Sequence, residues 1–262
     1  MSNTATVLAF DFGASSGRAI RAVYDGQNLN YEEIHRFENI PIEKDGHLCW
    51  DVETLLKEIH TAIQKAGTFD SLGFDTWGVD FGLLDTDGHL LANPVHYRDA
   101  RTNGKPEQAA ARMPAEELYA HTGNQIMAIN TLFQLLALQE QEPELLQKAE
   151  QVLFMPDLFA ALLGAEPVCE RSIASTSQML DPRTGQWSRE VLAAYGLNEN
   201  HFASLVASGT VTGTLITGAK IIAVAGHDTQ CASAAMPCAE EDAEHTAFLS
   251  CGTWSLLGTE LD

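Results

Sequence analysis

The chain has 262 residues, with 36 acidic residues against 15 lysines and arginines, and its formal net charge is −21. A chain of this length buries roughly 70–75% of its unfolded surface, which excludes intrinsic disorder and predicts a real core. So acidic a surface repels a phosphate backbone and excludes nucleic acid as a partner; an anionic ligand needs local donors such as backbone N–H groups, a placed arginine or a bound cation.

The cysteines and the N-terminus favour a reducing, cytoplasmic setting. Five cysteines, an odd and scattered set, lack the spacing of a disulfide scaffold or a zinc site. The first ten residues carry no positive region and lead to Asp11, unlike a signal peptide. No apolar run approaches the ~18 residues that span a bilayer, so no membrane is expected as a partner.

The first 85 residues predict an α/β domain. Strands are expected at 7–10, 19–24 and 29–37, joined by the small-residue loop DFGASSGR and a DGQN turn. From Val52 to Ala66 apolar residues recur at helical spacing, with Asp51 as N-cap and Gly67 as the stop. Further strands at 71–75 and 79–85 complete a β-β-β-α-β order, which indicates a mixed sheet with a helix on its face.

The rest of the chain predicts a helical insertion and then a return to the sheet. Residues 103–163 are expected to be mostly helical, with breaks at Pro114, Gly123 and Pro143, and helical spacing resumes at 188–195. A buried strand is predicted at 220–226, followed by a helix, and AEEDAEH is typical of a linker. The last segment repeats the strand–turn–strand layout of the first, and two such units can hold one phosphate chain from both sides.

The loop DFGASSGR combines the features of a phosphate turn. Gly13 and Gly17 allow close backbone approach and positive φ, the two serines supply hydroxyls, and Arg18 offers a planar donor fork. Asp11 is a candidate contact for Mg²⁺. An ordinary hairpin, with Asp11 accepting turn N–H groups, explains the same spacing.

The segment GFDTWGVDFGLLD is a candidate sugar-side motif. Gly78 falls between two strands, where glycine lets a ligand touch the main chain, and Trp77 either stacks on a sugar or belongs to the core. Asp75 and Asp80 are candidate hydroxyl ligands or turn caps, with capping favoured for Asp75.

Two further segments carry candidate chemistry. Arg98, Asp99 and Arg101 fit either a polyol-binding loop or an internal salt-bridged loop. Asp228 follows a strand that ends in glycine and opens a helix, which places a carboxylate where ligands of α/β folds bind. A base there can take a hydroxyl proton during phosphoryl transfer, although without further context a helix N-cap explains the residue better.

Five motifs in register along residues 7–258 resemble the FGGY family of carbohydrate kinases, and among them those that act on L-rhamnulose. They are DFGASSGR, DTWGVDFGLLD, HYRDARTNG, AVAGHDT and LSCGTWSLLG. The resemblance implies an α/β fold of the actin-like, ribonuclease-H-like (ASKHA) type, with a mixed sheet and a helical insertion. It further implies a sugar-binding domain over residues 1–238, then a linker and the first hairpin of a truncated nucleotide-binding domain over residues 239–262.

The same resemblance implies a reaction and a site. The γ-phosphate of MgATP would pass to the O1 hydroxyl of L-rhamnulose or a similar ketose, with Asp228 as general base and Asp11 as the magnesium contact. The remaining positions match the first phosphate loop (Ala14, Ser15, Ser16, Gly17, Arg18), an ATP contact of the second loop (Thr253) and sugar contacts (Gly78, His227, Asp228, Thr229).

Two departures and the chain length qualify this expectation. Gly226 precedes the HDT motif where a residue such as serine is expected, and Cys251 replaces a small hydroxyl residue before GTW. With little of a nucleotide-binding domain, the isolated chain is expected to be weakly active or inactive as a kinase. The alternatives are a natural short form that acts as a non-catalytic sugar-binding or assembly module, and a kinase for another ketose such as L-fuculose or L-ribulose.

Overall fold

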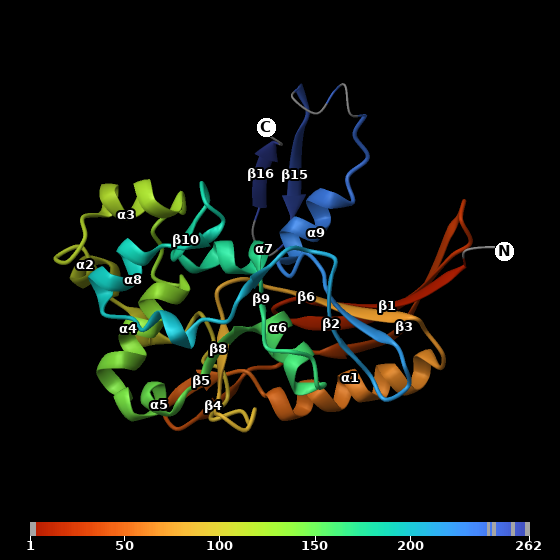
Figure 1. Cartoon of the computed structure of the whole chain (residues 1–262), viewed down its shortest axis with the longest axis horizontal. Helices are drawn as coiled ribbons and strands as arrows, with labels where there is room; N and C mark the ends of the chain where they lie inside the picture. Colours follow the sequence, from red (N-terminus) through yellow and green to blue (C-terminus); the bar gives the residue numbers. More distant parts are fainter. Residues whose placement is uncertain (1–3, 240–241, 243–244, 253–254, 260–262) are drawn as a thin grey trace.

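A six-stranded mixed sheet forms the centre of the computed structural model, which describes residues 4–239, 242, 245–252 and 255–259. The strand order is β13-β14-β6-β1-β2-β3 (Figure 1). The strands are β1 (Ala5–Phe12), β2 (Ser16–Tyr24), β3 (Leu29–Glu38), β6 (Ser71–Thr76), β13 (Thr210–Thr214) and β14 (Lys220–Ala223). β6 runs parallel to both β1 and β14, and the other pairs are antiparallel. The mixed sheet expected from the sequence is confirmed.

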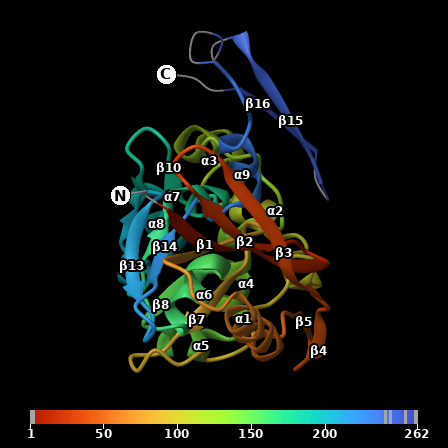
Figure 2. The same ribbon diagram turned by 90° about the vertical axis from the view of Figure 1, so that its right-hand side faces the viewer.

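One face of the sheet carries the core. Along β1, Leu8, Phe10 and Phe12 are fully buried, whereas Ala9 between them is exposed, as expected of a strand with one covered face. Phe10 stacks on Phe74 of β6, with ring centroids 4.9 Å apart. Helices α1 (Val52–Ala66) and α6 (Met155–Leu162) cover this face, as Figures 1 and 2 show. Each buried aromatic or leucine contributes about 1.5–3 kcal/mol to the folded state.

Helix α1 confirms its predicted boundaries. The Asp51 carboxylate accepts a hydrogen bond from the Thr54 N–H at 3.1 Å, and Gly67 ends the helix with a φ of 67°. A glycine is needed at this stop because residues with a side chain seldom adopt a positive φ.

The helical part lies beside the sheet and has its own core. Its helices are α2 (Lys105–Ala109), α3 (Ala115–Thr122), α4 (Thr131–Gln141), α5 (Pro143–Lys148) and α8 (Arg189–Tyr195). The mostly helical prediction for residues 103–163 misses one strand, β8 (Gln151–Phe154), which pairs antiparallel with β7 (Phe81–Leu84). This strand has one polar residue followed by three buried apolar ones, which is too short a run for a periodicity that separates a strand from a helix.

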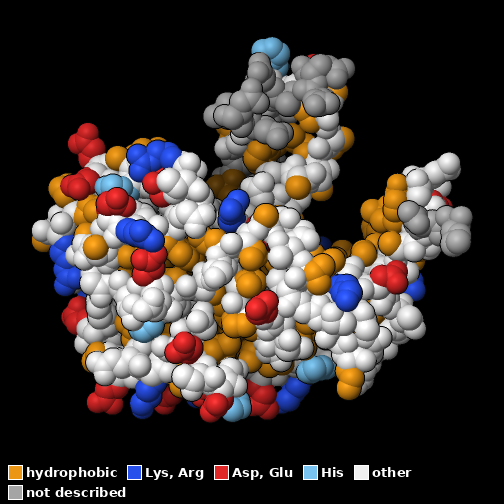
Figure 3. All heavy atoms as spheres, in the orientation of Figure 1, with side chains coloured by type: hydrophobic (Ala, Val, Ile, Leu, Met, Phe, Trp, Pro, Cys, Tyr) orange, Lys and Arg blue, Asp and Glu red, His pale blue; other side chains and the backbone are white. Residues whose placement is uncertain are grey.

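The remaining elements are short. They are β4 (Ile42–Lys44), β5 (His47–Cys49), β9 (Cys169–Glu170), α7 (Arg171–Ala174), β10 (Leu180–Asp181), β11 (Gln186–Trp187), β12 (Leu205–Val206), α9 (Asp228–Ala234) and 3-10 turns at Ala100–Thr102, Ser175–Ser177 and Glu199–His201. No helix among the described residues is long and apolar enough to cross a membrane. On the face in Figure 3, acidic side chains are scattered over the surface instead of gathering in one patch.

A separate hairpin projects from the main body. β15 (Ala247–Cys251) and β16 (Ser255–Thr259) pair antiparallel, and β15 contacts α9 (Figures 1 and 2). This layout repeats the strand–turn–strand arrangement of β1 and β2, as the sequence predicts. The division into domains at residues 238 and 239 stays a prediction.

Candidate functional site

Three carboxylates converge where β1, β6 and α9 meet. Asp11 lies in β1 and is the Cα partner of Asp75 in β6, and the neighbouring Thr76 forms a parallel bridge with His227, next to Asp228. Burial, followed by the negative charges of Asp11 and Asp228, raises the pKa of Asp75 to about 8. The pairing of Asp11 with Asp75 and the bridge beside Asp228 bring the three residues to one edge of the sheet, so strand register assembles the cluster.

Arg18 supplies the positive charge nearest Asp11. The two residues are Cα partners across β1 and β2, and the Arg18 Nε atom lies 3.1 Å from an Asp11 carboxylate oxygen. Burial raises the pKa of Asp11, and the Arg18 guanidinium lowers it in part. The Arg18 side chain is 38% exposed, so its donor fork stays within reach of a second anion.

The donor set at this cluster fits a magnesium ion. Asp11 and Asp75 present carboxylates from neighbouring strands on the same side of the sheet, and their repulsion is a cost that a divalent cation relieves. Mg²⁺ is usually held by one or two carboxylates together with phosphate oxygens and water. Asp75 is the acid that the sequence assigns to turn capping, so the structure adds it to the candidate site.

The predicted phosphate turn is held by a residue outside the motif. Asn39 is buried, its N–H donates to the Ser15 carbonyl at 3.0 Å, and its side-chain amide donates to the Gly13 carbonyl at 3.0 Å. The Gly13 N–H also donates to the Ser16 carbonyl at 2.9 Å. These bonds fix the backbone of residues 13–16, including Ala14, in one conformation.

The motif's glycines do not use the positive φ that glycine allows. Neither Gly13 nor Gly17 is among the positive-φ glycines of the described chain. Gly17 lies within β2, and a Cβ atom there would fall 2.3 Å from the Phe37 ring. Glycine is needed at position 17 because an aromatic ring of β3 occupies the space of its side chain.

The indole of Trp77 belongs to the core, which favours the alternative interpretation of this residue. Trp77 is 6% exposed, and its ring centroid lies 4.0 Å from that of Trp50. Both indole N–H groups donate to the Asp80 carboxylate, from Trp50 at 2.6 Å and from Trp77 at 3.0 Å. The Asp80 carboxylate is therefore occupied by buried donors instead of by sugar hydroxyls.

Gly78 opens a tight turn at the end of β6. The Asp80 N–H donates to the Gly78 carbonyl at 2.9 Å around Val79, whose φ is 69°, an unfavourable value for a β-branched residue. The Val79 N–H donates to the Thr176 hydroxyl at 3.0 Å, and its carbonyl accepts from the Thr131 hydroxyl at 2.7 Å. A Cβ on Gly78 would lie 3.0 Å from Thr176, so a side chain and not an open space faces this glycine.

The charged loop at residues 98–101 is internally bonded. The Asp99 carboxylate accepts from the Leu48 N–H at 2.9 Å and contacts the His47 ring at 3.2 Å. The buried Arg101 donates to the Gln134 side chain at 3.0 Å. The structure favours the internal loop over a polyol-binding loop for Asp99 and Arg101.

Asp228 is not a helix cap. Helix α9 begins at Asp228, and its N-cap is His227, which makes no side-chain capping bond. The Asp228 carboxylate accepts from the N–H of Thr229 at 2.5 Å and from its hydroxyl at 3.1 Å, lies 3.5 Å from His227 Nε2, and is 39% exposed. The capping explanation is therefore wrong, and one accessible carboxylate stands at the edge of the sheet.

The departure at Gly226 has a packing reason. A Cβ atom at this position would lie 3.0 Å from Pro156 and 3.3 Å from Ile173. Contacts of this length are tighter than almost any real Cβ makes, so a serine would force its neighbours to move.

The second phosphate turn is described only in part. Cys251 ends β15 and is exposed, and Gly252 follows it. Thr253, the predicted ATP contact, lies outside the described residues.

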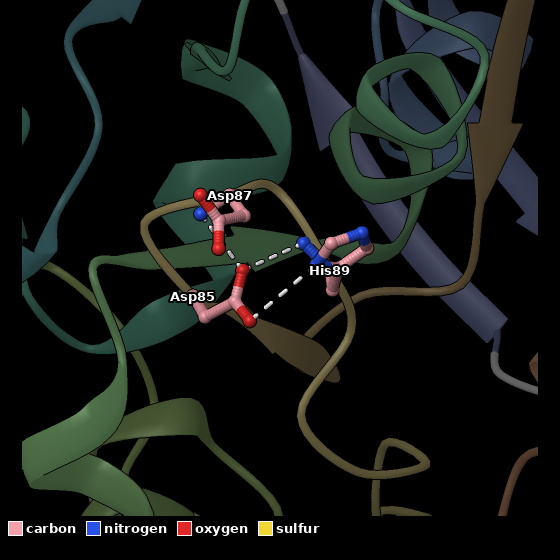
Figure 4. Close-up of side chains that lie close together, drawn as sticks. All are labelled: Asp85, Asp87 and His89. Atoms are coloured by element: carbon pink, nitrogen blue, oxygen red, sulfur yellow. Dashed lines mark hydrogen bonds and ion pairs between the residues drawn. The ribbon is translucent and has the colours of Figure 1, made fainter.

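Asp85, Asp87 and His89 form a separate cluster in the turn after β7. These three residues lie close enough together for metal ligation, and the Asp85 carboxylate accepts from the N–H of Asp87 at 2.9 Å and of His89 at 2.8 Å (Figure 4). These bonds satisfy the turn, and the cluster lies outside the candidate site.

Known proteins match most of this chain. Residues 6–234 match the family described as FGGY family of carbohydrate kinases, N-terminal domain. A rhamnulokinase of Bacteroides thetaiotaomicron is 43% identical over 268 residues, which cover 97% of this chain and 55% of that protein.

Solved structures of low sequence identity share the fold. A carbohydrate kinase from Novosphingobium aromaticivorans matches with a TM-score of 0.79 and 21% identity over 98% of this chain and 56% of its own. A ligand-bound xylulose kinase from Lactobacillus acidophilus matches with a TM-score of 0.75 and 17% identity, over 87% and 49%. The expected fold class is confirmed, and the chain spans about half the length of these relatives.

Proposed function

Since the chain belongs to the FGGY family of carbohydrate kinases, of which it carries the N-terminal domain, we propose that it is the sugar-binding half of an ATP-dependent ketose kinase. The observation that carries this proposal is the convergence of Asp11, Asp75 and Asp228 beside the braced turn of residues 13–16. Three acids and one arginine beside a turn with a fixed backbone suit phosphoryl transfer, which depends on positioning and on charge neutralisation.

Asp228 is the proposed general base. Its exposed carboxylate takes the proton of the attacking sugar hydroxyl as that oxygen bonds to the γ-phosphorus and the bond from phosphorus to the leaving ADP oxygen breaks. Thr229 holds one carboxylate oxygen through two hydrogen bonds, which leaves the other oxygen for the substrate. His227 and Gly78 are the proposed contacts of the sugar, and Gly78 would contact it through the main chain, because Thr176 occupies the space of a side chain there.

Asp11, Arg18 and the 13–16 turn are the proposed phosphate side. When bound, Mg²⁺ neutralises charge on the ATP phosphates, and Asp11 with Asp75 would hold it. Arg18, which pairs with Asp11 through Nε, would donate from its guanidinium to a phosphate oxygen of ATP. The hydroxyl groups of Ser15 and Ser16 would donate to the same phosphates. The acidic surface does not prevent this, because the cation, Arg18 and the backbone act at short range.

L-Rhamnulose, phosphorylated at O1, is the proposed substrate. The proposal is supported by the 43% identity to the Bacteroides thetaiotaomicron rhamnulokinase, and the chain covers only 55% of that protein. The β15–β16 hairpin is proposed to begin the nucleotide-binding domain and to bring Thr253 to the phosphates. The 262-residue chain alone is expected to bind the ketose and to turn over ATP weakly or not at all.

The test is a ketose panel on the complete gene product, with Asp228→Asn beside the wild type. A coupled ADP assay should show turnover of L-rhamnulose and a loss of about three to four orders of magnitude in kcat for Asp228→Asn, since removal of a general base costs this much at the upper end. Asp85→Asn is the matched control, because it makes the same change in an exposed turn outside the site. Wild-type turnover in Asp228→Asn would refute the role of Asp228 as general base. A higher kcat/KM for L-fuculose or L-ribulose than for L-rhamnulose would show that the substrate is another ketose.

A further inference from the structure

Glu170 is buried directly behind the peptide that leads into Asp228. The residue is 2% exposed, and its Oε2 atom accepts from the N–H groups of Ser172 at 2.9 Å and Ile173 at 3.3 Å, at the start of α7. The same oxygen accepts from the Gly226 N–H at 2.9 Å, two residues before the proposed base. One buried carboxylate therefore ties α7 to the segment between β14 and α9.

Ser172 extends this contact by one residue. Its hydroxyl donates to Glu170 Oε2 at 2.6 Å and accepts from the His227 N–H at 3.3 Å. On the other side, the Gly226 carbonyl accepts from the Thr76 N–H at 2.9 Å, at the end of β6. The two peptide N–H groups before Asp228 and the carbonyl between them are thus held from opposite directions.

We propose that Glu170 and Ser172 are positioning residues that fix the orientation of Asp228, an inference that rests on the proposed role of Asp228 as general base. One buried oxygen that accepts from several backbone N–H groups is a directional anchor, because each of these groups loses its partner if its segment moves. Loss of this anchor leaves the Gly226 N–H without its partner in the interior, and the segment must shift to satisfy it. A shift of 1 Å at a reacting group lowers a rate by about 100-fold.

The two carboxylate oxygens of Glu170 have different partners, so a glutamine can keep the hydrogen bonds while it removes the negative charge. Oε1 accepts from the Ser208 hydroxyl at 2.7 Å, whereas Oε2 receives the donors of α7 and Gly226. In Glu170→Gln, the amide oxygen can take the place of Oε2 and the NH₂ group can donate to the Ser208 hydroxyl, so every bond survives. Glu170→Ala removes all of these bonds.

A matched pair of serine substitutions separates positioning from stability. Ser172→Ala removes the hydroxyl between Glu170 and the His227 N–H. Ser188→Ala removes a buried hydroxyl that accepts from the Val191 N–H at 3.3 Å at the start of α8. Figure 1 places α8 within the helical part, apart from α9. Both variants lose one serine hydroxyl that accepts from a backbone N–H, and only Ser172→Ala touches the segment before Asp228.

The variants are compared in the complete gene product by Tm, kcat and the KM values for ATP and ketose. Ser172→Ala is expected to lower kcat about tenfold and Glu170→Ala about 100-fold, with KM for ATP unchanged, and Glu170→Gln to stay within about threefold of wild type. Ser188→Ala should lower Tm and leave kcat unchanged.

The proposal is overturned if Ser172→Ala keeps wild-type kcat, if Ser188→Ala loses as much, or if Glu170→Gln is as slow as Glu170→Ala. Should Glu170→Ala fail to fold, the serine pair decides. Asp228→Asn distinguishes a failure of the positioning role from a failure of the proposed function. If Asp228→Asn is inactive while Ser172→Ala is not impaired, only the positioning role fails; if Asp228→Asn is fully active, the proposed function fails first.

Discussion

Asp11 and Asp75 are direct Cα partners in the parallel register of β1 and β6. Residues in register on neighbouring strands point to the same side of a sheet, so the two carboxylates share one surface. After burial, the charge of Asp11 is the largest cause that raises the pKa of Asp75 to about 8, and Asp228 adds to it. A cation that bridges this surface replaces repulsion with attraction.

We expect Asp75→Asn to weaken the use of Mg²⁺. In the complete gene product, the Mg²⁺ concentration for half-maximal rate should rise about tenfold, as is typical when one oxygen of a metal site or its supporting shell is changed. Binding of Mn²⁺ followed by electron paramagnetic resonance gives a readout independent of turnover. Asp25→Asn, in the exposed turn between β2 and β3, is the control and should change neither value. Unchanged Mn²⁺ affinity in Asp75→Asn would remove Asp75 from the site.

Asn39→Ala should loosen the phosphate turn without affecting the sugar side. The substitution removes the hydrogen bond to the Gly13 carbonyl. Because one such bond contributes about 1 kcal/mol, the KM for ATP should rise about fivefold. The KM for ketose should stay constant. Asn28→Ala, in the exposed turn before β3, is the control with the same change of side chain. Equal effects on both KM values would show a general loss of structure and contradict the specific role.

Gly17→Ala is expected to destabilise the folded chain by about 1–3 kcal/mol, because the added Cβ overlaps the Phe37 ring. Urea unfolding of the 262-residue chain measures this directly. In a double-mutant cycle with Phe37→Leu, the smaller side chain should recover part of the loss. Strictly additive free energies would show that the ring does not cause the effect.

Asp157 should make stability depend on pH. Burial raises the pKa of this carboxyl from its usual 3.8 to about 8, although both of its oxygens accept from the Glu170 N–H. Between these values the folded state holds a proton that the unfolded chain has released, so the free energy of unfolding falls as pH rises through that range. Asp157→Asn lacks this proton exchange, and its Tm relative to wild type should increase from pH 5 to pH 9. A constant Tm difference would contradict this ionisation behaviour.

The fold is predictable where an element carries its own local signal. Helix α1 shows an amphipathic repeat, an N-cap at Asp51 and a glycine stop at Gly67, and all three are present in the structure. Strand β8 carries only three consecutive apolar residues, and its partner β7 lies far away in sequence. Pairing at such separation depends on the packed core, which the local sequence does not encode.

The candidate site divides along the same line. Asp11 and Asp228 stand in motifs, so their types and neighbours in the sequence indicate chemistry. Asp75 joins them through strand register, and Asn39 reaches the phosphate turn from the far end of β3. Both residues reach the site through the pairing of strands in the sheet, which the local sequence around each residue does not show.

Helix α9 is attached to the sheet, to α7 and to the hairpin. Its first residue is Asp228, the segment before it is bonded to Glu170, Ser172 and β6, and the helix also contacts β15. The proposed proton acceptor is therefore bonded through its own segment to the sheet and to α7, and the hairpin contacts the same helix. Approach of a nucleotide from the hairpin side would bring the phosphate to the base, while the base keeps its place beside the sugar.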